Sequence, residues 1–266
     1  MREALALIRA RWLTLGSYRA QLVFSTFGLF VSVIPIYFVS RALQPMMASS
    51  ISNQGQQYFA FLVVGLISFA FINTATGALH AAFSSDIGNG SLEAVLATPI
   101  SIPSLIVGML GQAFTWTVLR TTLLLVGATL LGAKIVWAKA LLAALILSLT
   151  VMAYIPLGVI AAALVLAFRT TGPLPTAITG LSMFLGGVYY PPSAIPSWLA
   201  YASKAVPLTY GLRALRRTFI DGAPMSASAG DLAALCGFAI VLSVVSLMVF
   251  SMAWTYARRA GTLAQY

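Results

Sequence analysis

The side chains that could do chemistry in this sequence are few and far apart. The chain has one histidine, His80, and one cysteine, Cys236. Its five acidic residues are too dispersed to form a carboxylate pair: Glu3, Asp86, Glu93, Asp221 and Asp231. A metal site or a Ser-His-Asp triad needs several such groups close together. The sequence therefore predicts no catalytic residue and no metal site, and an enzyme acting within the membrane is the least supported hypothesis.

The chain also lacks a nucleotide-binding motif. A phosphate loop needs a lysine in the pattern G-x-x-x-x-G-K-[ST], whose glycines let the backbone approach the phosphates. None of the three lysines, Lys134, Lys139 and Lys204, has that glycine context. We therefore expect that this chain binds no cofactor and does not hydrolyse ATP by itself.

One basic residue, Arg120, lies near the middle of a long apolar segment, 104–131. A charge at such a place is costly in lipid and usually faces protein or a wet cavity. Thr117, Thr121 and Thr122 lie near it in the sequence and could solvate it. Two interpretations stay open: Arg120 pairs within the protein, for example with a backbone carbonyl, or it lies on a route for a transported substrate.

Three further arginines lie near the C-terminal end of a short apolar segment, Leu208–Ile220. Arg213, Arg216 and Arg217 are spaced i, i+3 and i+4, which predicts a single basic face on a helix. This face could rest on lipid phosphates, or it could bind the anionic head group of a lipid-like substrate.

The composition predicts which kind of protein carries these residues. The chain has 266 residues, of which 60% are hydrophobic and 8% are charged, whereas a soluble domain has about 25% charged residues. The apolar runs are continuous rather than alternating, which favours membrane-spanning helices over a β-barrel. The net charge of +10 is scattered among these runs, so we attribute it to topology and anionic lipid rather than to nucleic acid.

A membrane span needs about 20 apolar residues. We expect six transmembrane helices, at about 20–41, 58–80, 104–131, 140–167, 173–190 and 232–256, preceded by an interfacial amphipathic helix at 1–19. Counted over all connections, seven basic residues then lie on each side of the membrane, which favours neither orientation. Excluding 192–222, which is interpreted below as a re-entrant hairpin rather than a plain loop, leaves seven on the side of the N-terminus and three on the other. By the excess of basic residues in cytoplasmic segments, this favours a multi-pass protein of the inner (plasma) membrane with both termini cytoplasmic.

The segment 86–103, DIGNGSLEAVLATPISIP, is a short polar connection between two spans. Leu92, Val95 and Leu96 would share one face of a helix that begins near Ser91. Glu93 in its first turn complements the helix dipole, and Pro99 ends the helix. The exposed apolar face could lie in the lipid interface or dock on another protein.

The segment 191–222 predicts two short amphipathic helices separated by Pro207. Neither is long enough to cross a bilayer. Placed between two spans, they are typical of a re-entrant hairpin.

Both segments resemble one known family. The run from Gly90 to Pro99, GSLEAVLATP, resembles the G-[ST]-L-E-x-[LV]-L-x-T-P signature of ABC-2 type transporter permeases. Residues 187–217 resemble the pattern G-x-x-[YF]-P…[IL]-P-x-W-L…P-L-T-Y-x-[IL]-[RE]-A-[IL]-R that precedes the last span in the same family. With the six-span layout, the resemblance covers most of the chain as one transmembrane domain, 1–266.

The resemblance implies a role for each segment. The first would be a cytoplasmic coupling helix seated in a separate ABC ATPase subunit through Ser91, Leu92, Glu93, Val95, Leu96, Thr98 and Pro99. The second would be a hairpin capping the exit pathway, with Tyr189, Tyr190 and Pro191 near the outer gate. Two copies of the chain would assemble with two ATPase subunits, which bind ATP and Mg. Such permeases mostly export drugs, lipids, glycolipids or polysaccharides.

Two other classes of function remain open. An ion-coupled secondary transporter or channel subunit usually carries acidic or histidine residues within its spans, and here only His80, at the end of a span, is available. The chain could also be a membrane scaffold for other subunits.

Overall fold

The computed structural model describes residues 19–48, 51, 57–88, 102–168, 174–191 and 196–259. All regular structure in these ranges is helical, as expected from the composition. The helices are α2 (Arg19–Met47), α3 (Tyr58–Gly88), α5 (Ile102–Leu130), α6 (Ala140–Phe168), α7 (Leu174–Leu185), α8 (Ser197–Ser203), α9 (Pro207–Phe219) and α10 (Ala229–Arg259). Two short 3₁₀ helices, η1 (Trp137–Lys139) and η3 (Met225–Ser228), precede α6 and α10.

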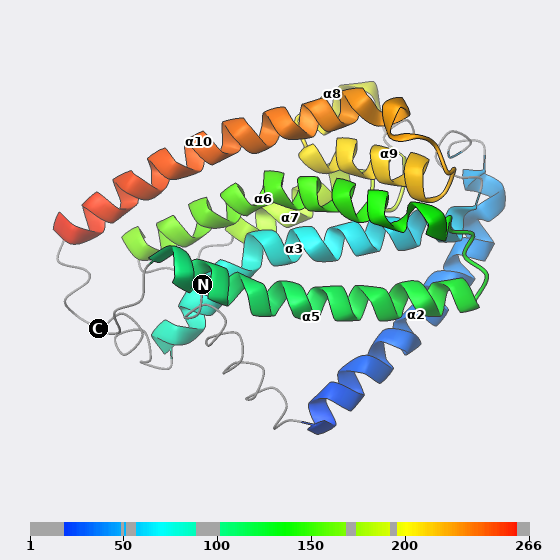
Figure 1. The fold of residues 1–266 in the computed structure, drawn as a ribbon, viewed down its shortest axis with the longest axis horizontal. Coiled ribbons are helices and arrows are strands. Elements are labelled where there is room, and N and C mark those ends of the chain that lie inside the picture. The colour runs from blue at the N-terminus through cyan, green and yellow to red at the C-terminus, as the bar shows by residue number, and fades with distance from the viewer. Residues whose placement is uncertain are drawn as a thin grey trace.

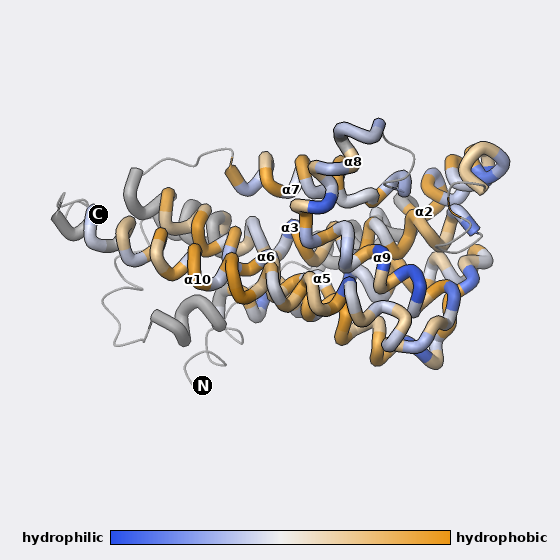
Figure 2. The backbone as a smooth tube through the Cα atoms, turned by 90° about the horizontal axis from the view of Figure 1, so that it is seen from above, coloured by the Kyte–Doolittle hydropathy of each residue, from blue (hydrophilic) through white to orange (hydrophobic). Residues whose placement is uncertain are grey.

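Four long helices, α3, α5, α6 and α10, run side by side along the bundle, and α2 crosses it at an angle (Figure 1). Helix α3 is central: it packs on α2, α5, α6, α7 and α9, while α10 packs on α6 and α9. Figure 2 shows α7 and α8 along one side of this bundle. The end of α3 and the start of α5 lie at one end of the bundle, and α9 lies toward the other (Figure 1).

Within the described residues, four helical segments could cross a membrane by length and composition: Tyr58–Ala78, Leu110–Leu130, Trp137–Leu164 and Met225–Ala253. They correspond to four of the six expected spans. The expected span 20–41 lies within α2, whose outward course in Figure 1 differs from that of the other long helices.

The expected fifth span, 173–190, differs most from the structure. Within the described residues the helix there is α7, which has 12 residues and is about 18 Å long at 1.5 Å per residue. A hydrocarbon core is about 30 Å thick, so a helix of this length does not cross it alone. Gly187, at φ 80°, adopts the left-handed conformation that ends helices, and the helix therefore stops before Tyr189.

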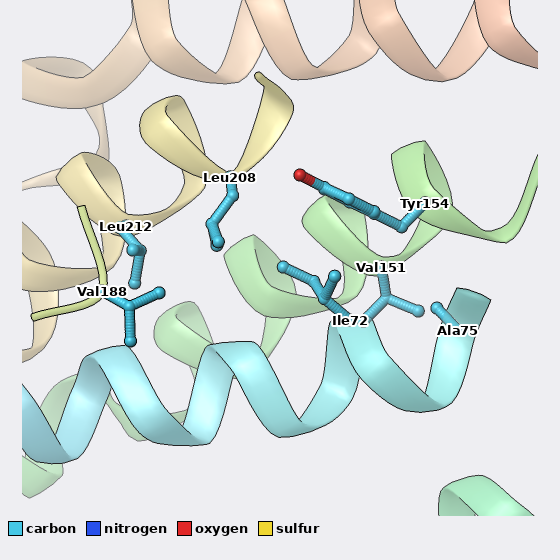
Figure 3. Packing of buried hydrophobic residues seen from close by; sticks show 7 residues of the cluster. All are labelled: Ile72, Ala75, Val151, Tyr154, Val188, Leu208 and Leu212. Carbon is cyan, nitrogen blue, oxygen red and sulfur yellow. The ribbon is translucent and has the colours of Figure 1, made fainter. Parts of the chain in front are cut away.

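The region expected to hold a hairpin has two short helices, α8 and α9. Helix α9 is strongly amphipathic and buries its apolar residues against α3 and α6. Figure 3 shows Leu212 of α9 next to Val188, and Leu208 pointing toward the side where Ile72 of α3 lies, all within one buried cluster. The apolar face of α9 is thus covered by the bundle itself rather than left for lipid.

Helices α3 and α6 approach closely at Gly158. A β-carbon at this position would collide with the backbone carbonyl oxygen of Ala75 and lie 3.2 Å from the Cα atom of Thr76. Because both atoms belong to the α3 backbone, no side-chain rotation can relieve the clash. The absence of a side chain at Gly158 therefore sets the spacing of the two helices.

We predict that Gly158→Ala destabilises the bundle. Overpacking costs about 1–3 kcal/mol, and for a chain of this size each kcal/mol lowers the unfolding midpoint by about 2–4 °C, so we expect a midpoint about 5 °C lower in a thermal-unfolding assay in detergent. The matched control is Gly237→Ala on α10, where a β-carbon meets no atom within 4 Å and alanine favours the helix. An equal midpoint for the two variants would contradict the close packing of α3 on α6.

Candidate functional site

The most constrained polar group in the described chain is the guanidinium of Arg216 on α9, which is 1% exposed. Its Nη1 donates to the carbonyl oxygen of Gly187 at 3.0 Å. Its Nη2 donates to the carbonyl oxygens of Val188 at 3.1 Å and Phe61 at 3.3 Å. The guanidinium carbon also lies 3.3 Å from the centre of the Phe61 ring. One side chain therefore joins α9, α3 and the turn that follows α7.

The backbone leaves room for this arrangement. At Gly65 of α3, a β-carbon would lie 3.0 Å from Nη2 of Arg216 and even closer to the carbonyl oxygen of Val188. Such a β-carbon would push the turn and the guanidinium apart. The planar fork of arginine donors suits several carbonyl oxygens at once, which a lysine could not match.

The turn 186–191 carries the three residues predicted to lie near an outer gate. Tyr189 is exposed, Tyr190 half-buried and Pro191 buried. The carbonyl oxygen of Tyr189 accepts a hydrogen bond from the Tyr58 hydroxyl at 2.8 Å, and the Tyr190 hydroxyl donates to the carbonyl oxygen of Phe184 at 2.9 Å. With the two carbonyls bound by Arg216, side chains fix the turn at four places.

The prediction that Arg213, Arg216 and Arg217 form a single basic face on α9 is wrong, because the three side chains point to different places. Arg216 lies at the border of the apolar face and points into the protein. Arg213 and Arg217 point instead to Asp231 at the start of α10, with shortest N–O distances of 3.1 Å and 3.8 Å. The Asp231 side chain is 8% exposed, so it ties α9 to α10. The sequence signal that could have predicted these ion pairs is the position of Asp231, an acidic residue in the first turn of the last span.

Arg120 on α5 is exposed on the surface of the single chain. The structure does not show the threonine hydroxyls solvating Arg120. The Thr121 hydroxyl donates to the carbonyl oxygen of Thr117 at 2.7 Å, and the Thr117 hydroxyl donates to the carbonyl oxygen of Ala113 at 3.0 Å. Among the residues that the structure describes, Arg120 makes no hydrogen bond or ion pair.

An apolar cavity of about 580 Å³ lies between α3, α5 and α6. Phe71, Phe114, Leu147 and Val151 contribute to its walls. The lining hydroxyl of Ser68 donates to a carbonyl of its own helix, at 2.8 Å, as do those of Thr121 and Ser148. The wall thus offers few free polar groups and could accept a hydrocarbon chain.

The predicted coupling residues lie outside the described residues: Ser91, Leu92, Glu93, Val95, Leu96, Thr98 and Pro99. The same holds for the expected interfacial helix, apart from Arg19, which begins α2. The structure does describe the two flanks of the coupling segment, since α3 ends at Gly88 and α5 begins at Ile102. Within the described ranges, no three His, Cys, Asp or Glu side chains come together in a way that could hold a metal ion.

Comparison with known proteins adds a further finding. The sequence model of a protein family described as "ABC-2 type transporter" matches residues 2–220, which include the coupling segment and the α8–α9 region. Nodulation protein J of Rhizobium meliloti (strain 1021) is 27% identical over 189 residues, covering 70% of this chain and 71% of that protein. Nodulation protein J of Rhizobium leguminosarum bv. viciae is 27% identical over 193 residues, covering 72% and 74%. That of Bradyrhizobium diazoefficiens is 24% identical over 199 residues, covering 74% and 75%.

Proposed function

This chain belongs to the ABC-2 type transporter family, and we propose that it is the membrane-spanning subunit of an exporter that moves an amphipathic, lipid-like molecule. Members of the family are transport subunits that work with a separate ABC ATPase. The match over residues 2–220 is the observation that carries the proposal. The four helical segments in the described part of the chain that are long and apolar enough to cross a membrane support it.

We further propose that ATP and Mg bind to the partner ATPase, and that residues 86–103 transmit its movement. Such a lever would act on its two flanks, α3 and α5. Helix α3 is suited to pass the movement on, because it packs on α6, α7 and α9. Through its Phe61 carbonyl and Arg216, it also contacts the turn that carries Tyr189 and Tyr190. A push at one end of α3 would therefore reach the proposed outer gate.

A second copy of the chain is part of this proposal, with the substrate path between the copies. Helix α7 supports it, because two of its three hydroxyl residues, Thr179 and Ser182, face inward while Leu181 is 61% and Phe184 53% exposed. Gly180, beside them, has no atom within 4 Å of its β-position. Small residues next to exposed apolar ones are common where membrane helices pack.

The proposed substrate combines an apolar and a polar part. The cavity between α3, α5 and α6 could accept the apolar part. Arg120, Arg213 and Arg217 remain candidates for contact with an anionic part, whereas the buried Arg216 serves the turn. Placement in the inner membrane, with both termini cytoplasmic, completes the proposal.

Reconstitution tests this function directly. We expect the chain to co-purify with its ATPase subunit and, in proteoliposomes, to move a fluorescent phospholipid between leaflets only when ATP is present. A partner ATPase carrying a substitution in its own catalytic glutamate is the control and should abolish movement while keeping the complex. Movement driven by an ion gradient without ATP would contradict the proposal and favour a secondary transporter.

A further inference from the structure

A polar cavity of about 900 Å³ opens at the end of the bundle near the turn that follows α5. It is distinct from the apolar cavity and from the turn bound by Arg216. Its walls come from the C-terminal half of α2, from residues 131–134 after α5, and from the end of α9. The charged side chains in its lining are Arg41, Lys134 and Asp221.

Hydrogen bonds fix the wall around these charges. The Gln57 side chain donates from Nε2 to the carbonyl oxygen of Gly132 at 2.8 Å, and its Oε1 accepts from the backbone N–H of Lys134 at 2.7 Å. These two bonds hold the turn after α5, where Gly132 has φ 92°. The Lys134 backbone is therefore fixed, while its side chain is exposed.

Arg41 is placed by an aromatic pair. Its guanidinium carbon lies 5.6 Å from the centre of the Tyr37 ring, and Tyr37 packs edge-on against Phe59 at 5.3 Å. Both aromatic residues line the cavity. The guanidinium is thus held over an apolar wall.

The charges in the cavity do not balance. Neither Arg41 nor Lys134 forms an ion pair with any residue in the described part of the chain. Asp221 is the one carboxylate in the lining, and it is already near a cation: partial burial raises the pKa of the Asp221 carboxyl, and the charge of Arg217 opposes that rise. Two cations thus face a carboxylate that has its own basic neighbour.

We propose that this cavity binds a phosphate-bearing anion through Arg41 and Lys134. Arginine and lysine are the side chains that bind phosphate oxygens best. Leu131 and Ile220 line the same cavity, so a ligand with an apolar part next to its phosphate also fits. Two sources share this chemistry: the head group of an anionic phospholipid and free phosphate.

A bound anion would have a structural consequence. Arg41 belongs to α2, which packs mainly on α3 and α5 within the part of the chain that the structure describes. Lys134 belongs to the turn between α5 and α6. A phosphate bound by both Arg41 and Lys134 would join α2 to the turn between α5 and α6. It would thereby restrict the tilt of α2 relative to the bundle. This inference rests on the cavity alone and does not depend on the proposed transport.

The test uses the full chain in detergent and native mass spectrometry. Phosphatidylglycerol and phosphatidylcholine are titrated separately, with and without inorganic phosphate. We expect wild type to bind phosphatidylglycerol more tightly than phosphatidylcholine. The double variant R41Q/K134Q should bind phosphatidylglycerol about three- to tenfold more weakly, because it loses two charge contacts that are partly exposed to solvent. Asp221→Asn should bind phosphatidylglycerol more tightly than wild type, because it removes the negative charge from the cavity.

The matched control is K139Q/K204Q, which removes the same charge from two lysines outside the cavity. It should bind phosphatidylglycerol like wild type. Competition by inorganic phosphate would assign a site for free phosphate, whereas binding of the lipid unaffected by phosphate would assign the lipid head group. Equal binding by wild type and R41Q/K134Q, or an equal loss in K139Q/K204Q, would overturn the proposal.

Discussion

Replacing Arg216 with methionine is expected to lower the unfolding midpoint of the chain by about 10 °C. The substitution leaves the carbonyl oxygens of Gly187, Val188 and Phe61 without their donors in a buried place. Each hydrogen bond to a charged group contributes about 1.5–3 kcal/mol, and the removed cost of burying the charge offsets part of the sum. A net loss of about 3 kcal/mol corresponds to roughly 10 °C in a chain of this size.

Two variants separate this effect from a loss of positive charge. Arg217→Met removes a guanidinium that is 39% exposed and 3.8 Å from Asp231, and exposed ion pairs contribute less than about 1 kcal/mol. Its midpoint should therefore change little. Arg216→Lys keeps the charge but not the planar fork, so we expect an intermediate midpoint. Thermal unfolding followed by tryptophan fluorescence measures all three variants.

The same substitutions have a functional readout. If the turn 186–191 is the outer gate, Arg216→Lys should keep ATP hydrolysis by the partner subunit but reduce lipid movement in proteoliposomes. Arg217→Met should reduce neither. Equal midpoints for Arg216→Met and Arg217→Met would show that the carbonyl contacts do not hold the turn, and the proposed link between α3 and the gate would fail.

The burial of Arg216 also shows where sequence reasoning ends. The spacing of Arg213, Arg216 and Arg217 predicted one basic face, because helical periodicity places these positions near one another. It did not show that α9 packs its apolar face on α3 and α6, which puts the border position Arg216 inside the protein. The acceptors of Arg216 are backbone carbonyls, which carry no sequence signal.

Long continuous apolar runs were easier to interpret. The segments 58–80, 104–131, 140–167 and 232–256 predicted helices that the structure contains as long candidate spans, since a run of about 20 apolar residues specifies a membrane helix by itself. The segment 173–190 was harder, because Gly186-Gly187 and the following Pro191-Pro192 indicate a break in the span without fixing where α7 ends. Two polar residues of α7, Thr179 and Ser182, face the bundle, and the Ser182 hydroxyl accepts a hydrogen bond from the Tyr154 hydroxyl at 2.9 Å.

The proposed coupling segment, residues 86–103, carries the largest expected effect on function. We predict that Leu96→Asp weakens binding of the ATPase subunit more than a hundredfold. The substitution places a carboxylate in an apolar contact, and a loss of about 3 kcal/mol, typical of a central interface residue, corresponds to that factor. Glu93→Lys should also uncouple hydrolysis from transport, because it reverses the charge in the first turn of the helix.

The matched control is Ala94→Asp, which adds the same carboxylate on the opposite face of the predicted helix. Affinity capture of the ATPase and its rate of ATP hydrolysis are measured for each variant, together with the unfolding midpoint of the chain alone. If Leu96→Asp detaches the ATPase while Ala94→Asp does not, and both chains unfold at the wild-type temperature, the apolar face of this segment is the docking surface. If both variants keep the ATPase bound and stimulated, that face lies in the lipid interface, and the ATPase must contact this chain elsewhere.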